Sequence, residues 1–247
     1  MTVPTEPPFA EAAAVRSYLR LMHELAIRVD LVARACTGEL NLTPPYAREY
    51  CFLQFRRICE LVALGCLQLH GDIPAARSSA AKKEWNAERI MKLLQRNHPH
   101  SFPQSLTRTK NTNGWHLEAN SKPNALTFTE FKALYNKCGE ILHRGSIRTI
   151  EAEEPIAKPD YDEVIHWSHK LVDLLNEHIV ARANGKGLFH ISLKTESGGP
   201  ACSVFSGFSE GSVNVATYNL DVRENAVEIH ALAENDPQPN PSFKRDV

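Results

Sequence analysis

Hydrophobic residues cover nearly every side of the segment from Cys51 to Leu69 if it forms a helix. One continuous stripe repeats at steps of three and four residues: Phe52, Phe55, Cys59, Val62, Cys66 and Leu69. A helix that is hydrophobic on all sides is buried among other elements. The spacing therefore predicts a central helix over residues 46–71, interrupted on one side by the charged residues Arg56, Arg57 and Glu60.

The same periodicity predicts four more helices around this one. They are expected over residues 10–36, 78–95, 127–145 and 160–184. Thr127 and Glu130 have the spacing of a capping box at the start of the fourth helix. A short hairpin is expected at residues 105–118, where Asn113-Gly114 is a typical two-residue turn.

After residue 185 the period changes from helical to alternating. Phe189, Ile191 and Leu193 share one face of a predicted strand, and three more strand patterns follow it before residue 233. The sequence therefore predicts a mainly α protein, with a five-helix bundle at 10–185 and a small antiparallel β meander at 186–233. Residues 234–247 have the composition of a disordered tail.

Composition narrows the class of protein only a little. The 247 residues are 43% hydrophobic and 23% charged, and the formal net charge is −1. These are values of an ordinary globular chain without the overall positive charge of many nucleic-acid binders. The start of the chain lacks a secretory signal and no segment has the pattern of a membrane span, so we expect a cytoplasmic protein without a membrane partner.

The end of the predicted fourth helix carries the first group of candidate catalytic residues. Glu140 and His143 lie one helical turn apart, and Lys137 precedes them by one more turn. Histidine can transfer protons near neutral pH. The alternative is structural, because a histidine at a helix end can also interact with the last backbone carbonyl groups.

A second group of candidates comprises binding residues. Arg56, Arg57 and Glu60 form either an internal ion pair of the central helix or a polar pocket in which an arginine faces a phosphate. Residues 77–110 form the one locally basic zone. This zone is either a solvated surface or a phosphate-contacting surface with Trp85 or Trp115 available for stacking on bases. Its candidate binding residues are Lys82, Lys83, Arg89, Lys92 and Arg96.

Metal and cofactor signatures are weaker. Asp162, His166, His169 and Asp173 lie along one stripe of the predicted fifth helix, opposite its hydrophobic side, which favours a solvated face over a metal site. We find no phosphate-binding loop, dinucleotide fingerprint or zinc motif. We therefore expect neither a metal nor a cofactor.

The five-helix layout, the segment FRRICEL at 55–61 and the segment YNKCGEILH at 135–143 together resemble HEPN-like helical domains. The resemblance covers residues 10–185. It implies a small, often dimeric bundle of a bacterial defence, toxin–antitoxin or RNA-processing system. Catalytic members of the family cleave RNA without a metal through an Arg-x4–6-His motif, and His143 stands at the histidine position.

The arginine of that motif is not matched, since Asn136, Lys137 and Cys138 occupy the positions where it would stand. The resemblance therefore implies a binding or regulatory protein, with RNA, a second copy of the chain and another protein as candidate partners. Two alternatives stay open: a metal-independent endoribonuclease that uses His143 with Lys137 or a distant arginine, and a structural protein-interaction module.

Overall fold

The computed structural model describes residues 11–112, 114–143, 161–185, 187–196, 198–206, 214–223 and 226–233. Side chains are described up to residue 220 within these ranges. The predicted tail at 234–247 and the predicted end of the fourth helix at 144–145 lie outside the described residues.

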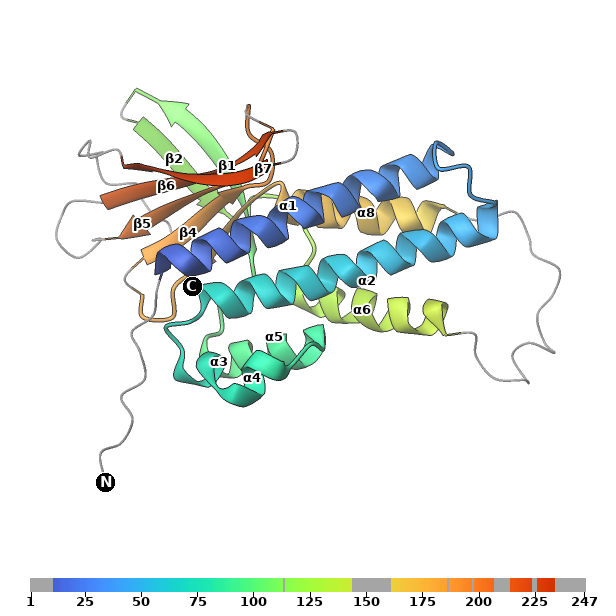
Figure 1. The fold of residues 1–247 in the computed structure, drawn as a ribbon, viewed down its shortest axis with the longest axis horizontal. Helices are drawn as coiled ribbons and strands as arrows, with labels where there is room; N and C mark the ends of the chain where they lie inside the picture. The colour runs from blue at the N-terminus through green and yellow to red at the C-terminus, as the bar shows by residue number, and fades with distance from the viewer. Residues whose placement is uncertain are drawn as a thin grey trace.

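Two long antiparallel helices form the axis of the molecule, α1 (Glu11–Cys36) and α2 (Pro44–Leu69), which lie side by side in Figure 1. The six stripe residues predicted for the central helix are all buried, as expected for a helix enclosed by others. Gly65 allows α1 to approach closely, because a Cβ atom there would lie 2.7 Å from the ring of Tyr18. The prediction that α2 is central to the helical core is confirmed.

The remaining helices pack around this pair. α6 (Phe128–Leu142) lies along α2, and α8 (Asp162–Leu175) contacts both α1 and α2 (Figure 1). α3 (Pro74–Arg77), α4 (Ser79–Lys83) and α5 (Ala87–Asn97) lie beneath the end of α2. The capping box of α6 is present as predicted: the Thr127 hydroxyl accepts from the backbone of Glu130, and the Glu130 carboxylate accepts from the backbone of Thr127.

All seven described strands belong to one antiparallel sheet in the order β2-β1-β3-β4-β5-β6-β7. Their bounds are β1 Gln104–Asn111, β2 Gly114–Ala119, β3 Glu177–Ala181, β4 Gly187–Ser192, β5 Ala201–Ser206, β6 Asn214–Arg223 and β7 Ala226–Ala233. The predicted hairpin is present as β1 and β2. It joins the rest of the sheet because Gln104 and Ser105 pair with Ile179 and His178.

The two faces of the sheet have different surroundings. Phe189, Ile191 and Leu193 belong to the main hydrophobic core, which confirms that they face one way. The inner face meets α1 and α8 (Figure 1). Leu188, between Phe189 and Gly187, belongs instead to a second small cluster with Leu106, which marks the outer face of the sheet.

One buried hydrogen bond joins α1 to β3. The Tyr18 hydroxyl lies 2.6 Å from Nε2 of His178, and Nδ1 of the same ring lies 2.9 Å from the Leu175 carbonyl oxygen. A carbonyl can only accept, so Nδ1 carries the proton and Nε2 accepts from Tyr18. Burial lowers the pKa of His178 to about 4, which keeps the ring neutral and suited to this pairing.

The predicted fold class is wrong. The structure is mixed α and β, with seven helices and a seven-stranded sheet among its described residues, instead of a five-helix bundle followed by a small meander. Residues 177–181, predicted as the end of the fifth helix, form β3 between β1 and β4. This position brings Ile179 and Val180 into hydrophobic clusters on the two faces, so tertiary burial overrides the helical period.

The predicted third helix, 78–95, is also interrupted. A Glu84 side-chain oxygen accepts from the backbone N–H groups of Trp85 and Asn86, and Asn86 in turn caps α5. Such local bonds replace helical ones and separate α4 from α5.

The main hydrophobic core contains residues from both predicted segments, 10–185 and 186–233, for example Phe55 and Phe189. No helix among the described residues is long and hydrophobic enough to cross a membrane.

Candidate functional site

A surface hollow of about 580 Å³ lies where α2, the end of α6 and the turn between α4 and α5 meet. Its charged and polar lining residues are Arg56, Arg57, Glu60 and His143. Arg56 and His143, which belong to separate groups of sequence candidates, both line it. We call it the helical hollow.

Glu60 organises the arginines of the helical hollow. One of its oxygens lies 3.4 Å from Nε of Arg56 and the other 2.8 Å from Nη1 of Arg57. The Glu60 side chain is only 13% exposed, whereas that of Arg57 is 57% exposed. Spacings of three and four residues place both arginines on the same side of α2 as Glu60. Two positive charges around one negative charge leave the group net positive.

Arg56 is fixed further by α6. Its Nη2 lies 3.4 Å from the Tyr135 hydroxyl, and its guanidinium carbon lies 4.9 Å from the centroid of the Tyr135 ring. Burial raises the pKa of Tyr135, while the nearby Arg56 acts in the opposite direction. Gly139, one turn later, faces the same guanidinium. Arg56 is therefore the positioned arginine and Arg57 the accessible one.

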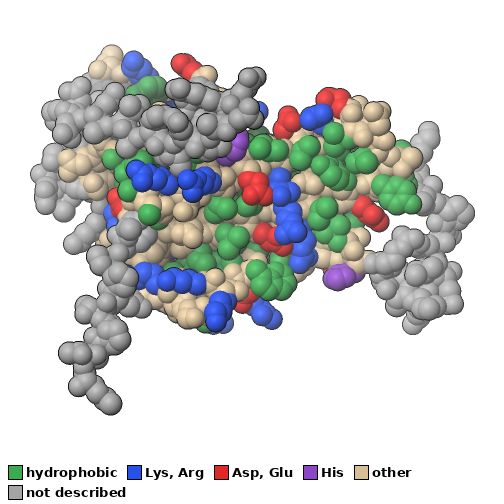
Figure 2. Space-filling view, in the orientation of Figure 1, with side chains coloured by type: hydrophobic (Ala, Val, Ile, Leu, Met, Phe, Trp, Pro, Cys, Tyr) green, Lys and Arg blue, Asp and Glu red, His purple; other side chains and the backbone are tan. Residues whose placement is uncertain are grey.

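The rest of the helical hollow is hydrophobic. Trp85, which is 62% exposed, lies in the turn before α5. Leu53, Leu64 and Leu142 complete the lining. Figure 2 shows this character over the helices, where exposed hydrophobic side chains lie in separate patches with basic and acidic side chains between them. An exposed tryptophan beside an exposed arginine can hold a planar group and an anionic group together.

His143 ends α6 and is exposed. Its backbone N–H donates to the Gly139 carbonyl oxygen at 3.1 Å. The other two candidates from this segment do not line the hollow. Lys137 instead lies 3.6 Å from Glu163 of α8, which also pairs with Arg48 at 2.6 Å, and Glu140 is exposed.

The five candidate binding residues of the basic zone lie on α4 and α5, near the helical hollow but outside its lining. Lys82, Lys83 and Arg96 are exposed. Lys92 pairs with Glu88 at 2.7 Å, and Arg89 lies 3.8 Å from Glu84. Part of the predicted positive charge is thus compensated within the same short helices.

The predicted stripe on the fifth helix does not gather metal ligands. His166 and His169 are exposed on α8. Within the described part of the chain, no three His, Cys, Asp or Glu side chains are arranged to hold a metal ion.

Two contacts at and near the helical hollow were not predicted. Tyr135 lies on the buried, hydrophobic side of α6, and its hydroxyl also reaches Arg56. The pairing of Lys137 with Glu163 joins residues of two helices that are 26 positions apart in sequence, and no local pattern predicts such a contact. The only sequence signal for the contact with Arg56 was the phenol hydroxyl of Tyr135 on an otherwise hydrophobic side of the helix.

Comparisons of the chain with protein-family models, with curated proteins and with solved structures found no match. The HEPN-like resemblance therefore stays a prediction made from the sequence.

Proposed function

We propose that this protein binds single-stranded RNA in the helical hollow, as a HEPN-like binding protein of a bacterial defence or toxin–antitoxin system. The observation that carries the proposal is the grouping of Arg57, Trp85 and His143 around one open hollow. A phosphate would contact Arg57, and a base would stack on Trp85. The exposed lysines of α4 would meet the neighbouring phosphates.

Binding is favoured over catalysis because the local residues of the cleavage motif are engaged elsewhere. Lys137, the only cation in the positions where the motif has its arginine, pairs with Glu163. Arg56 contacts both Glu60 and Tyr135. A guanidinium held by protein groups keeps fewer N–H donors for the charge that develops on a phosphate during cleavage.

One observation supports the endoribonuclease alternative. His143 lines the same hollow as Arg56 and Arg57, so arginine and histidine come together from two different helices. In this alternative His143 transfers the proton and Arg57 stabilises the phosphate. A homodimer stays part of either version, because the HEPN-like resemblance implies one.

Fluorescence anisotropy with a labelled single-stranded RNA tests the binding proposal. We expect Arg57→Ala to weaken binding and to reduce the slope of log affinity against log salt by about 0.7, the value for one phosphate contact on a single strand. Lys194→Ala removes a positive charge from the sheet side and serves as the matched control. Equal losses in both variants would contradict a site in the helical hollow.

A cleavage assay separates binding from catalysis. The binding proposal predicts that wild type and His143→Ala leave the RNA intact to the same extent, while both still bind it. Cleavage by the wild type that is lost in His143→Ala would replace the binding proposal with the endoribonuclease.

A further inference from the structure

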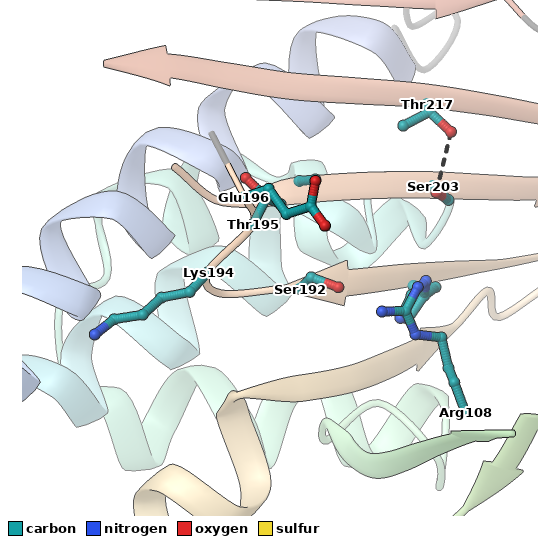
Figure 3. A pocket seen from close by; sticks show the side chains of 9 residues that line it. Arg108, Ser192, Lys194, Thr195, Glu196, Ser203 and Thr217 are labelled. Carbon is teal, nitrogen blue, oxygen red and sulfur yellow. Dashed lines mark hydrogen bonds between the residues drawn. The ribbon is translucent and has the colours of Figure 1, made fainter. Parts of the chain in front are cut away.

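A second pocket, of about 360 Å³, lies on the outer face of the sheet (Figure 3). It is formed by β1, β4, β5 and β6 together with the loop after β4. Its polar lining residues include Arg108, His190, Ser192, Glu196, Ser203 and Thr217. His190 and Ser192 reach this face because strand side chains alternate, while Phe189 and Ile191 between them enter the core. We call it the sheet pocket.

Arg108 is held in place within the sheet pocket. Its Nη2 lies 2.6 Å from Oε1 of Glu177 on β3, and the Ser192 hydroxyl donates to the same oxygen at 3.2 Å. The guanidinium carbon also lies 5.4 Å from the centroid of the Trp115 ring. Arginine has five N–H donors, so these contacts orient the group and leave donors for a ligand. Figure 3 shows Arg108 reaching from β1 toward Ser192.

His190 supplies an unused polar atom at the same place. The residue is 6% exposed, and its buried Nε2 has no hydrogen-bond partner among the described residues. Glu177 Oε1 is 3.9 Å away, beyond hydrogen-bonding distance. Burial, helped by the charge of Arg108, lowers the pKa of His190 to about 4, so the ring is neutral at pH 7. An unpaired buried polar atom is costly, and a ligand atom in the pocket would remove that cost.

Hydroxyl groups form the opposite side of the sheet pocket. Ser203 and Thr217, on neighbouring strands, lie 3.1 Å apart, and either can donate to the other. Each hydroxyl keeps further hydrogen-bonding capacity. Glu196 adds an acceptor from the loop, whereas Lys194 points away from the other labelled side chains in Figure 3. The lining therefore offers donors near Arg108 and mixed donors and acceptors near Thr217.

We propose that the sheet pocket binds a small hydroxylated molecule that carries one anionic group, a carboxylate or a phosphate. The anionic group lies at Arg108 and accepts from the Nε2–H group of His190, whose neutral ring carries its one proton on Nε2. The hydroxyl groups of the ligand bond to Ser203, Thr217 and Glu196. The volume suits a small molecule and not a polymer.

Charge balance distinguishes this site from the helical hollow. Arg108 is compensated by Glu177, and Lys194 and Glu196 contribute one charge of each sign. Binding in the sheet pocket therefore depends on directed hydrogen bonds more than on excess positive charge. It should change little with salt, unlike RNA binding.

The test is an NMR titration of the full chain with ¹⁵N-labelled histidine, using gluconate and glycerol 3-phosphate as probes at constant ionic strength. His190→Gln assigns the His190 imidazole signals. We expect a saturable shift of these signals with at least one probe, at a dissociation constant below about 10 mM. Response to gluconate alone identifies a carboxylate ligand, and response to glycerol 3-phosphate alone identifies a phosphate ligand.

Matched variants locate the binding. Arg108→Lys keeps the charge but loses the guanidinium fork, so we expect affinity to fall about tenfold. Ser203→Ala should weaken binding less, and Arg20→Ala, which removes an exposed positive charge of α1, should leave it unchanged. Variants are compared only after circular dichroism shows that they fold like the wild type.

Three results would overturn the proposal. The first is the absence of a saturable shift at His190 with both probes. The second is an equal shift with uncharged glycerol, which would show that the anionic group does not contribute to binding. The third is a loss in Arg20→Ala as large as that in Arg108→Lys, which would indicate unspecific attraction by surface charge.

Discussion

The helical hollow and the sheet pocket share the same three kinds of side chain but arrange them for different ligands. Each has a carboxylate that holds an arginine, Glu60 with Arg57 and Glu177 with Arg108, and each has a histidine. In the hollow, the histidine and the arginine are exposed beside hydrophobic walls. In the pocket, the histidine is buried among hydroxyl groups.

Exposure determines what each histidine can do. His143 stands at a helix end, where a long ligand such as RNA can reach it. His190 lies within a strand, where only a small molecule can contact Nε2. Similar side chains therefore do not define a similar function: the backbone that carries them sets the size and the solvation of the ligand.

The largest expected effect is on stability at low pH, and it separates the buried His178 and His190 from the exposed His143. The pKa of His178 and of His190 is lowered to about 4 in the folded chain, against about 6.5 in the unfolded chain. Between these values the unfolded chain binds more protons, so stability falls as the pH falls below 6.5 and the loss is complete below about pH 4. At pH 4.5 each of these two histidines should lower the free energy of unfolding by about 2 kcal/mol relative to pH 7.

Urea unfolding at both pH values measures this loss. We expect the free energy of unfolding of His190→Gln to fall by about 2 kcal/mol less than that of the wild type on acidification. His143→Gln, which changes an exposed residue, should lose as much as the wild type. An identical acid response of all three proteins would contradict the neutral, buried state of His190.

The next effect compares two exposed tryptophans. Trp85 in the helical hollow is 62% exposed, and Trp115 on β2 is 50% exposed and lies beside Arg108. Stacking of a base on an aromatic ring is worth about 1–3 kcal/mol, so Trp85→Ala should weaken RNA binding about tenfold or more. Trp115→Ala is the matched control, and we expect it to bind RNA like the wild type. The reverse order in anisotropy measurements would move the RNA site to the sheet.

The smallest effect compares the two carboxylates. Glu60→Gln removes the negative charge between Arg56 and Arg57, so RNA affinity should rise about fivefold at low salt, through a gain of about 1 kcal/mol. Glu177→Gln removes a charge of the sheet pocket and should leave RNA affinity unchanged. Weaker RNA binding by Glu60→Gln would show that Glu60 is needed mainly to orient the arginines.

The regular helical patterns were predictable, and the sheet was predictable only in part. The α2 stripe and the Thr127–Glu130 capping box depend on neighbouring residues, so they are visible in the sequence. The predicted fold class was wrong because the β1–β3 pairing joins residues more than 70 positions apart in sequence. β3 contains Ile179 and Val180, whose strand conformation is set by partners on both sides.

The helical hollow could be predicted in its residues but not in its geometry. Arg56, Arg57, Glu60 and His143 were all identified as candidates, and they line one hollow. Lys137 was expected beside His143 but pairs with Glu163 of α8. The sheet pocket was not predicted, because Arg108 and His190 are brought together by strand order and register.

Ultraviolet crosslinking of the wild-type protein to single-stranded RNA, followed by mass spectrometry of its tryptic peptides, tests the central claim most directly. A base stacked on Trp85 should crosslink to the peptide 84–89, which trypsin releases between Lys83 and Arg89. Trp85→Ala should remove this product. We expect the crosslinked nucleotide on that peptide, and crosslinks confined to the peptide that contains Trp115 would contradict an RNA site in the helical hollow.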